Sequence, residues 1–320
     1  MTGQCDKIYF DTSFFSSQNN RSLLLGYFNP LLLRQHPLQT TESFDVRLYR
    51  TFQDRTDESA FVQHEHGGVA KYMRGVHELQ YECTWREVLL AKNPALVQFG
   101  DAGHTLKSSL RHELTLDGRD SRALPTRGAA LSVAHELAGF GGNSRFFKHE
   151  SVLQLNWTLL PWLSLGVSGR FGAMAVPQTP GNQLSPSDRF YLGGPTSFAG
   201  FAKHGVGGGS TRRAQLGGTA YWNVRSMLSC PLDALVPDIG DVFNARLHCF
   251  AQTGALAQPR AGAWHAINSD LASQYRTSVG FGIGMSLGAA RIEFNYALPL
   301  RASAFDRPEP IQFGVAVKLI

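Results

Sequence analysis

Few residues in this chain have the types and spacing that enzyme chemistry needs. His64 and His66 flank Glu65, so both imidazoles could share one strand face, but no third zinc ligand stands out. The glycine-rich stretch 205–211 looks like a phosphate loop, yet it lacks the Gly-Lys-Ser/Thr ending and no helix follows it. The sequence has no G-x-S-x-G elbow and no kinase signature. We therefore expect a protein that is not an enzyme and that uses no metal and no cofactor.

Charge and cysteine usage narrow the class of protein further. The net charge is +5 over 320 residues, 17% of the residues are charged, and no run of five like charges occurs. A nucleic-acid partner normally needs a clustered basic face or arm, so we expect none. The four cysteines have no CxxC spacing and the N-terminus has no secretory signal, which favours a reduced intracellular setting.

A long apolar loop is the strongest candidate for a functional segment. Residues 175–214 span about 40 positions, whereas structureless loops longer than about 12–15 residues are usually functional or disordered. The loop is rich in Gly, Pro, Ser and Thr, yet it carries five large apolar side chains, Phe190, Tyr191, Leu192, Phe198 and Phe201. This is too apolar for a solvated linker, so we expect the loop to fold back into the space that its flanking elements enclose.

Those flanking elements follow a strict period-two alternation of apolar and polar or small residues. Val279, Phe281 and Ile283, for example, interleave with Ser278, Gly280 and other small residues, as on a strand with one apolar face. We count about 15 such segments, each near the 9–11 residues that a tilted membrane strand needs. The predicted strands are 7–15, 22–30, 42–52, 67–75, 77–88, 94–100, 104–116, 128–139, 148–159, 162–174, 215–229, 241–253, 275–288, 290–299 and 311–320.

The predicted fold class is all-β: a transmembrane antiparallel β-barrel of about 15–16 strands, forming one domain over residues 1–320 with the loop 175–214 in its lumen. Arg, Glu, Asn and Gln on the polar faces suit a wet lumen. Tryptophans near strand ends suit an aromatic girdle; these are Trp85, Trp157, Trp162 and Trp222. A soluble β-rich binding protein or enzyme is the alternative, because alternation alone does not say whether the apolar face meets lipid or a protein core.

The loop also resembles a known signature. Residues 188–201 read DRFYLGGPTSFAGF, which resembles the lumenal-loop signature of the outer-membrane assembly barrels, above all their mitochondrial branch, the sorting-and-assembly barrels. The likeness continues through 103–110, 137–140, 216–222 and 312–314, and so covers most of the chain in order. The loop-motif residues that it singles out are Phe190, Gly193, Gly194, Ala199, Gly200 and Phe201.

The resemblance implies a multi-pass barrel of the mitochondrial outer membrane that inserts and assembles β-barrel precursors. Its implied partners are the unfolded precursors, peripheral sorting-and-assembly subunits and membrane lipid. Precursors would leave sideways through a seam between the first and last strands. The physics agrees, because a strand in hydrocarbon must keep its backbone groups paired, and an open seam offers two templating edges.

The last predicted strand carries a second signal. Gln312, Gly314, Val317 and Leu319 fit the polar-x-Gly-x-x-hydrophobic-x-hydrophobic pattern of mitochondrial barrel proteins. Gly314 would let another group approach the backbone closely. These four residues are the predicted seam residues.

Two positions depart from the family pattern in a mutually consistent way. Family members usually have Arg before the Gly-aromatic pair of the loop, where this chain has Ala199. The strand that normally meets this Arg reads aromatic-x-Asp-x-Gly, and here the pattern is Phe250, Gln252 and Gly254, with Gln in the acidic place. Neither change leaves a lone buried charge. We expect the loop still to dock, less tightly, on Phe198, Phe201 and backbone bonds.

The N-terminal sequence is the other departure. Nothing in it resembles the polypeptide-transport-associated domain that precedes the barrel in the family, and residues 6–10 look like its second barrel strand. We therefore expect the first strand to be missing from this chain. Two further functions stay open on the same barrel: a passive outer-membrane pore, and a paralogue with reduced function.

Overall fold

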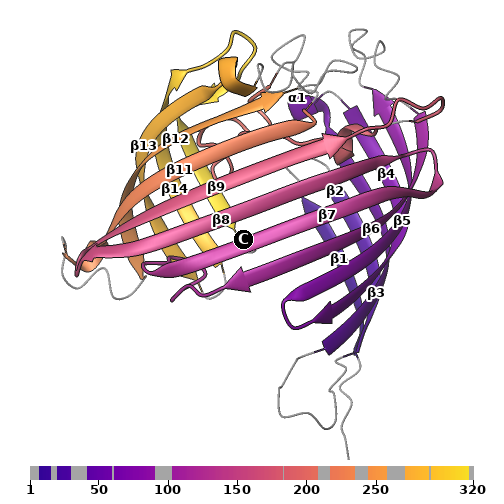
Figure 1. The fold of residues 1–320 in the computed structure, drawn as a ribbon, viewed down its shortest axis with the longest axis horizontal. Helices are drawn as coiled ribbons and strands as arrows, with labels where there is room; N and C mark the ends of the chain where they lie inside the picture. The colour runs from indigo at the N-terminus through magenta and orange to yellow at the C-terminus, as the bar shows by residue number, and fades with distance from the viewer. Residues whose placement is uncertain are drawn as a thin grey trace, which may run out of the picture. The chain divides into compact units, whose positions relative to one another are not determined.

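The described part of the chain is almost entirely β-structure (Figure 1). The computed structural model describes residues 7–15, 20–29, 42–59, 61–90, 103–182, 184–207, 217–234, 244–257, 271–287 and 290–316. Fourteen strands form one antiparallel sheet in the order β1-β2-β3-β4-β5-β6-β7-β8-β9-β11-β12-β13-β14-β16, and β10 pairs with β15 in a second, two-stranded sheet. Among these residues, no helix has the length and hydropathy to cross a membrane.

The strand bounds follow the alternation of the sequence. The strands of the large sheet are β1 (Lys7–Phe15), β2 (Asn20–Asn29), β3 (Glu42–Arg55), β4 (Phe61–Arg74), β5 (His77–Leu90), β6 (Gly103–Asp117), β7 (Gly128–Gly142), β8 (Phe146–Leu160), β9 (Leu163–Ala175), β11 (Ala220–Pro231), β12 (Ala245–Ala257), β13 (Arg276–Leu287), β14 (Ala290–Arg301) and β16 (Ile311–Ala316). The two short strands are β10 (Gly200–Phe201) and β15 (Pro308–Glu309), and the helical turns are α1 (Thr56–Ser59), η2 (Pro186–Asp188) and η3 (Leu232–Ala234).

Every predicted strand that falls on described residues is found as a strand, and the largest shifts in bounds are at the starts of β4 and β11. The predicted strand 94–100 lies outside the described residues. Strand β4 begins at Phe61 rather than at 67, because Gln63 and Glu65 share a strand face with Phe61 and the period-two contrast is lost there. Strand β11 begins at Ala220 rather than at 215. The residues just before it are used differently, because Gly218 pairs with Phe190 and the Thr219 N–H donates to the Ala257 carbonyl.

Two compact units make up the chain. The first comprises 1–115, 133–149 and 174–188, and the second comprises 116–132, 150–173 and 189–320. In the first unit, β4 and β5 form a hairpin in which Arg74 pairs with His77 around a two-residue turn, and Gly75 adopts a positive φ of 57° there. In the second unit, β11, β12, β13, β14 and β16 pair in succession.

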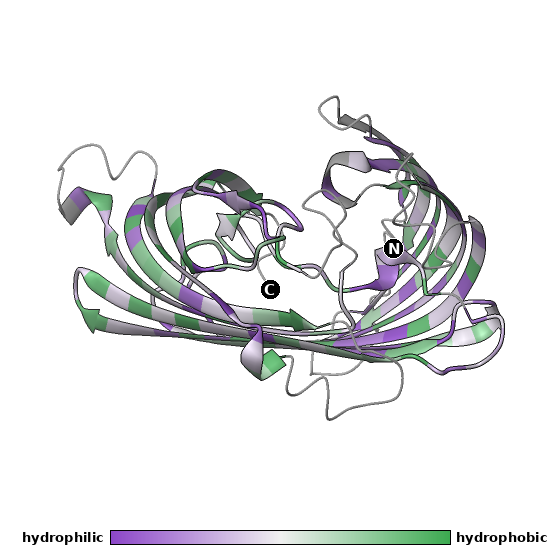
Figure 2. Cartoon of the chain, turned by 90° about the horizontal axis from the view of Figure 1, so that it is seen from above, coloured by the Kyte–Doolittle hydropathy of each residue, from purple (hydrophilic) through white to green (hydrophobic). Residues whose placement is uncertain are grey.

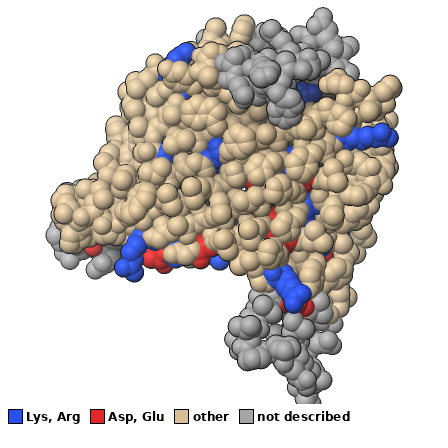
Figure 3. Space-filling view, in the orientation of Figure 1, with Lys and Arg blue, Asp and Glu red and all other residues tan. Residues whose placement is uncertain are grey.

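Most strands of the large sheet present an apolar and a polar side, which Figure 2 shows as alternating colours along the ribbons. In β16, Ile311, Phe313 and Val315 are 62%, 64% and 53% exposed, whereas Gln312 is buried. In β14, Phe294 is exposed and Asn295 is buried. Most of the surface in Figure 3 carries neither Lys or Arg nor Asp or Glu. So many large exposed apolar side chains mark a surface made for lipid rather than water, which favours the membrane interpretation over a soluble β-protein.

Candidate functional site

The segment between β9 and β11, residues 176–219, corresponds to the predicted loop 175–214, and its tip is a tight turn. The Gly194 N–H donates to the Phe201 carbonyl at 2.8 Å, and the Phe198 N–H donates to the Gly194 carbonyl at 2.9 Å. Gly193, Gly194 and Gly200 all have positive φ, at 118°, 98° and 91°. Such backbone favours glycine, because a Cβ meets steric conflict there. The turn therefore depends on the glycines that the family signature places in it.

Two aromatic rings fill this turn. Phe198 and Phe201 are both fully buried, and their rings meet edge to face with centroids 5.4 Å apart. At the base of the loop, Phe190 exchanges two backbone hydrogen bonds of 2.8 Å with Gly218, and its ring packs on Tyr221 of β11 at 4.8 Å. The loop in the second unit is thus closed at its base and packed at its tip.

The loop tip lies against the polar face of β11, β12 and β13. The Gln252 Nε2 donates to the Ala199 carbonyl at 2.7 Å, and the Ser278 Oγ donates to the same oxygen at 2.7 Å. Ala199 itself packs in an apolar cluster with Phe250 and Ala297. Gly254 leaves room for the Phe198 ring, which would lie 2.9 Å from a Cβ at that position. The structure therefore brings all three predicted docking-strand residues, Phe250, Gln252 and Gly254, to the loop.

The departure at Ala199 has a physical explanation in these contacts. A small apolar side chain fills the space beside Phe250, and the neutral amide of Gln252 binds the backbone carbonyl of Ala199 instead of a guanidinium. No buried charge is created, so no desolvation of an ion has to be offset.

The last strand also touches the loop. The Gln312 Oε1 accepts the Gly200 N–H at 2.9 Å, and the Gln312 Nε2 donates to the Phe201 carbonyl at 2.6 Å. Gly314 lies beside Pro195, whose ring carbons would be 2.9 Å from a Cβ on Gly314. Val317 and Leu319, the other two predicted seam residues, lie outside the described residues.

Sequence patterns missed an ion pair that binds the segment before β16. Asp306 and Arg276 are both buried, with the Arg276 Nε 3.0 Å from the Asp306 Oδ2. The Asp306 Oδ1 also accepts the Gly207 N–H at 3.2 Å. Two residues after Asp306 the chain enters β15, which pairs with β10 of the loop. The connection between β14 and β16 is therefore bound to the loop. One Asp and one Arg 30 positions apart have no spacing that a sequence pattern could detect.

A buried charge cluster lies in the first unit, at the start of the signature. The Arg86 guanidinium is 2.7 Å from the Asp188 carboxylate and 3.2 Å from that of Glu65. The Lys107 ammonium is 3.7 Å from Asp188, and it also binds two glutamates, Glu82 at 3.0 Å and Glu136 at 2.8 Å. Each cation thus has more than one carboxylate, which is what a buried charge requires.

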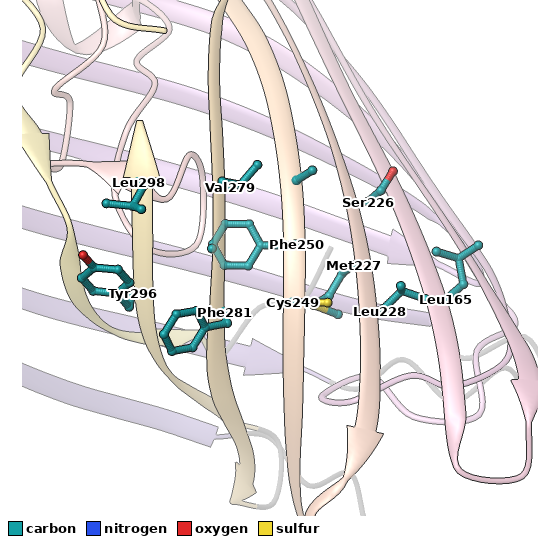
Figure 4. A pocket seen from close by; sticks show the side chains of 12 residues that line it. Leu165, Ser226, Met227, Leu228, Cys249, Phe250, Val279, Phe281, Tyr296 and Leu298 are labelled. Atoms are coloured by element: carbon teal, nitrogen blue, oxygen red, sulfur yellow. The ribbon is translucent and has the colours of Figure 1, made fainter. Parts of the chain in front are cut away.

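An apolar recess of about 520 Å³ is present on β9 and β11–β14 (Figure 4). Leu165, Leu228, Phe281 and Leu298 line it, with the small side chains of Ser226 and Ala251 between them. It has no convergent set of acids, bases or nucleophiles of the kind that a reaction centre needs. In the described part of the chain, no three His, Cys, Asp or Glu side chains gather as metal ligands would.

We expect Gly314→Ala to loosen the loop, because the new methyl group would overlap the Pro195 ring. Overpacking of this kind costs about 1–3 kcal/mol. Tryptic cleavage at Lys203 measures the effect, since the backbone around this exposed residue is hydrogen-bonded through Ala202 and Gly205 and must open before cleavage. Gly169→Ala in β9 is the control, because a Cβ there meets open space. Equal cleavage rates for both variants would contradict the contact between Gly314 and the loop.

Comparisons with known proteins show which family the chain is similar to. The profile of the Omp85 superfamily domain matches residues 2–317. The chain is 34% identical over 331 residues to the sorting and assembly machinery component 50 homolog of Homo sapiens, covering 100% of this chain and 68% of that protein. It is 39% identical over 251 residues to the homolog of Xenopus tropicalis, covering 76% of this chain and 53% of that protein.

Among solved structures, the crystal structure of BamA from Haemophilus ducreyi lacking POTRA domains 1-3 matches with a TM-score of 0.79 at 14% identity. The match covers 98% of this chain and 64% of that chain. This likeness in fold supports the predicted all-β, antiparallel fold class. Sequence and structure agree, and the chain belongs to the Omp85 superfamily, together with the sorting and assembly machinery component 50 homologs.

Proposed function

We propose that this protein inserts β-barrel precursors into the mitochondrial outer membrane through a seam at its terminal strands, without covalent chemistry. Its place among the sorting and assembly machinery component 50 homologs supports the general role, assembly of outer-membrane β-barrel proteins, and the mitochondrial outer membrane as its location. Unfolded precursors and the other subunits of the sorting and assembly machinery are the proposed partners.

Strand β16 is the observation that carries the seam. It is the last strand in the hydrogen-bonded order and pairs with β14 over six positions, from Tyr296↔Ile311 to Arg291↔Ala316. Its apolar side chains are more than half exposed. A precursor strand added beside it would find main-chain partners and lipid at the same place, which is β-augmentation. Since an unpaired backbone group costs several kcal/mol in hydrocarbon, such pairing lowers the barrier to insertion.

Disulfide trapping of a precursor tests the seam. In a chain whose native cysteines are replaced by serine, Val315→Cys on β16 should form an adduct with a cysteine in the terminal strand of an arrested porin precursor. Leu153→Cys is the matched control, because Leu153 is an exposed apolar residue of β8, in the middle of the strand order. We expect the adduct at 315 and not at 153. Equal adducts at both positions, or none at 315, would refute the seam while leaving the general assembly role in place.

A further inference from the structure

We infer that Gln312 is a positioning residue that fastens the last strand to the loop, so that β16 is held by the loop tip as well as by β14. The inference rests on the proposed function in one respect, namely that β16 forms the seam. The sequence pattern places Gln312 in a strand signal. In the structure its side chain is 3% exposed and engages the loop.

The carboxamide of Gln312 uses both of its halves on adjacent residues of the loop. Its Oε1 accepts the Gly200 N–H at 2.9 Å and its Nε2 donates to the Phe201 carbonyl at 2.6 Å. An amide side chain offers an acceptor and a donor side by side without charge. Leucine would take this partner from the Gly200 N–H and would leave the Phe201 carbonyl with the Gly194 N–H alone, and a buried polar group that loses a partner is expensive.

The same two loop residues also pair, through the backbone, with the segment that precedes β16. Gly200 and Phe201 form β10, which pairs with Glu309 and Pro308 of β15. Next to this pair, the Ala202 N–H donates to the Arg307 carbonyl and the Arg307 N–H donates to the Gly205 carbonyl, both at 2.9 Å. The segment entering β16 and the first inward side chain of β16 therefore hold one short stretch of loop, 200–205.

The preceding loop residues are held by other strands. The Asn223 Nδ2 of β11 donates to the Ser197 carbonyl at 2.7 Å, while Gln252 of β12 and Ser278 of β13 bind the Ala199 carbonyl. The loop tip thus joins β16 to β11, β12 and β13, which are not its neighbours in the sheet. Any movement of β16 away from these strands must either break the Gln312 contacts or carry the loop with it.

Asn295 offers a matched control for this role. It is opposite Gln312 in the register of β14 and β16, is equally an amide and is fully buried. Its partners, however, are His248 and Glu293 rather than the loop. Asn295→Leu therefore removes a buried amide from the same face without touching the loop.

Tryptic cleavage at Lys203 in purified full chain, reconstituted in lipid, measures the attachment. We expect Gln312→Leu to raise the cleavage rate by at least about tenfold, because the Gly200 N–H loses the Gln312 acceptor and the Phe201 carbonyl loses one of its two donors. Asn295→Leu should leave that rate within about twofold of the unsubstituted chain, since the hydrogen bonds of Asn295 go to His248 and Glu293 and not to the loop. Gln312→Leu cleaved as slowly as Asn295→Leu would overturn the inference, whatever the outcome of any assembly assay.

A carboxyl at position 312 gives a readout that simple loss of packing would not. In Gln312→Glu, the ionised form has no proton to donate to the Phe201 carbonyl, and it also faces the Glu309 carboxylate. The other charged groups on this connection form the ion pair between Arg276 of β13 and Asp306 before β15. The protonated form can donate and accept as the amide does. Relative to the unsubstituted chain at the same pH, we expect fast cleavage at about pH 9 and near-normal protection at about pH 6. The Gln312→Leu chain should be cleaved fast at both pH values. A cleavage rate that does not depend on pH in the Gln312→Glu chain would contradict the role of Gln312 as a donor to the loop.

Disulfide trapping at β16 separates this inference from the proposed function. If Gln312 restrains β16, the porin adduct at Val315→Cys should form several-fold faster when Gln312→Leu is added. If Gln312→Leu speeds cleavage at Lys203 but leaves the rate of adduct formation unchanged, the inference that Gln312 restrains β16 is overturned. Absence of the adduct in every variant would instead contradict the seam, and the cleavage data on Gln312 would then stand by themselves.

Discussion

Replacing Phe198 by alanine is expected to free the loop tip at a cost of about 3–5 kcal/mol. Phe198 is fully buried, meets Phe201 edge to face, and lies over Gly254 of β12. Its removal leaves a cavity that the rigid turn cannot close, because both sides of the turn are hydrogen-bonded to Gly194. The expected result is a rise of about two to three powers of ten in the cleavage rate at Lys203, under conditions in which the loop opens and closes fast relative to cleavage.

Phe281→Ala is the control for this prediction. Phe281 is 62% exposed on the apolar face of β13, the side opposite to Ser278 and the loop. It removes the same atoms from the same unit without touching the turn, so cleavage at Lys203 should change little. A Phe198→Ala chain that resists trypsin as well as the Phe281→Ala chain would show that the aromatic pair does not hold the loop.

Arg86→Leu is expected to destabilise the first unit by about 3–5 kcal/mol, because it leaves buried carboxylates without their counter-charge. Asp188 loses its 2.7 Å partner and Glu65 its 3.2 Å partner, while Lys107 is shared with two further glutamates. The measurement is the temperature at which the reconstituted protein loses its folded mobility in unheated gel electrophoresis. We expect a fall of several degrees.

Arg111→Leu is the comparison for Arg86. The Arg111 side chain is 29% exposed, against 4% for Arg86, and pairs with Glu113 at 3.1 Å, so its loss should cost less than the loss of Arg86. Arg86→Lys should lie between the two, since it keeps the charge but loses the fork that can serve two carboxylates. Equal transition temperatures for Arg86→Leu and Arg111→Leu would contradict a structural role for the buried cluster.

Period-two alternation predicted most of the strands, because successive side chains of a strand point to opposite faces and the two faces meet different surroundings. The prediction failed at the start of β4, where polar Gln63 and Glu65 share a face with Phe61 and no face is consistently apolar. It also gave no sign of β10 and β15, since two residues are too few for any period. The bounds of such elements come from tertiary pairing rather than from local sequence.

The candidate site was predictable to the extent that it lies in one continuous stretch. The signature around Phe190–Phe201 identified the loop, and the paired departures at Ala199 and Gln252 predicted a neutral attachment, in keeping with the hydrogen bond between them. Asp306 and Arg276 were not predictable, because Asp306 lies on the connection before β15 and Arg276 begins β13, and nothing in their spacing links the two. The hydrogen bonds between Gln312 and the loop were also not predicted. The sequence pattern assigned Gln312 to the terminal-strand signal and so to the seam.

The measurement that tests the central claim most directly is the yield of assembled porin in mitochondria depleted of this protein, with and without re-expression of this chain. The account predicts that porin assembly falls on depletion and recovers with the re-expressed chain, provided that the chain resists extraction by alkaline carbonate. Recovery should be weaker with the Phe198→Ala chain. Porin assembly that continues at its normal rate in depleted mitochondria would contradict the insertase function.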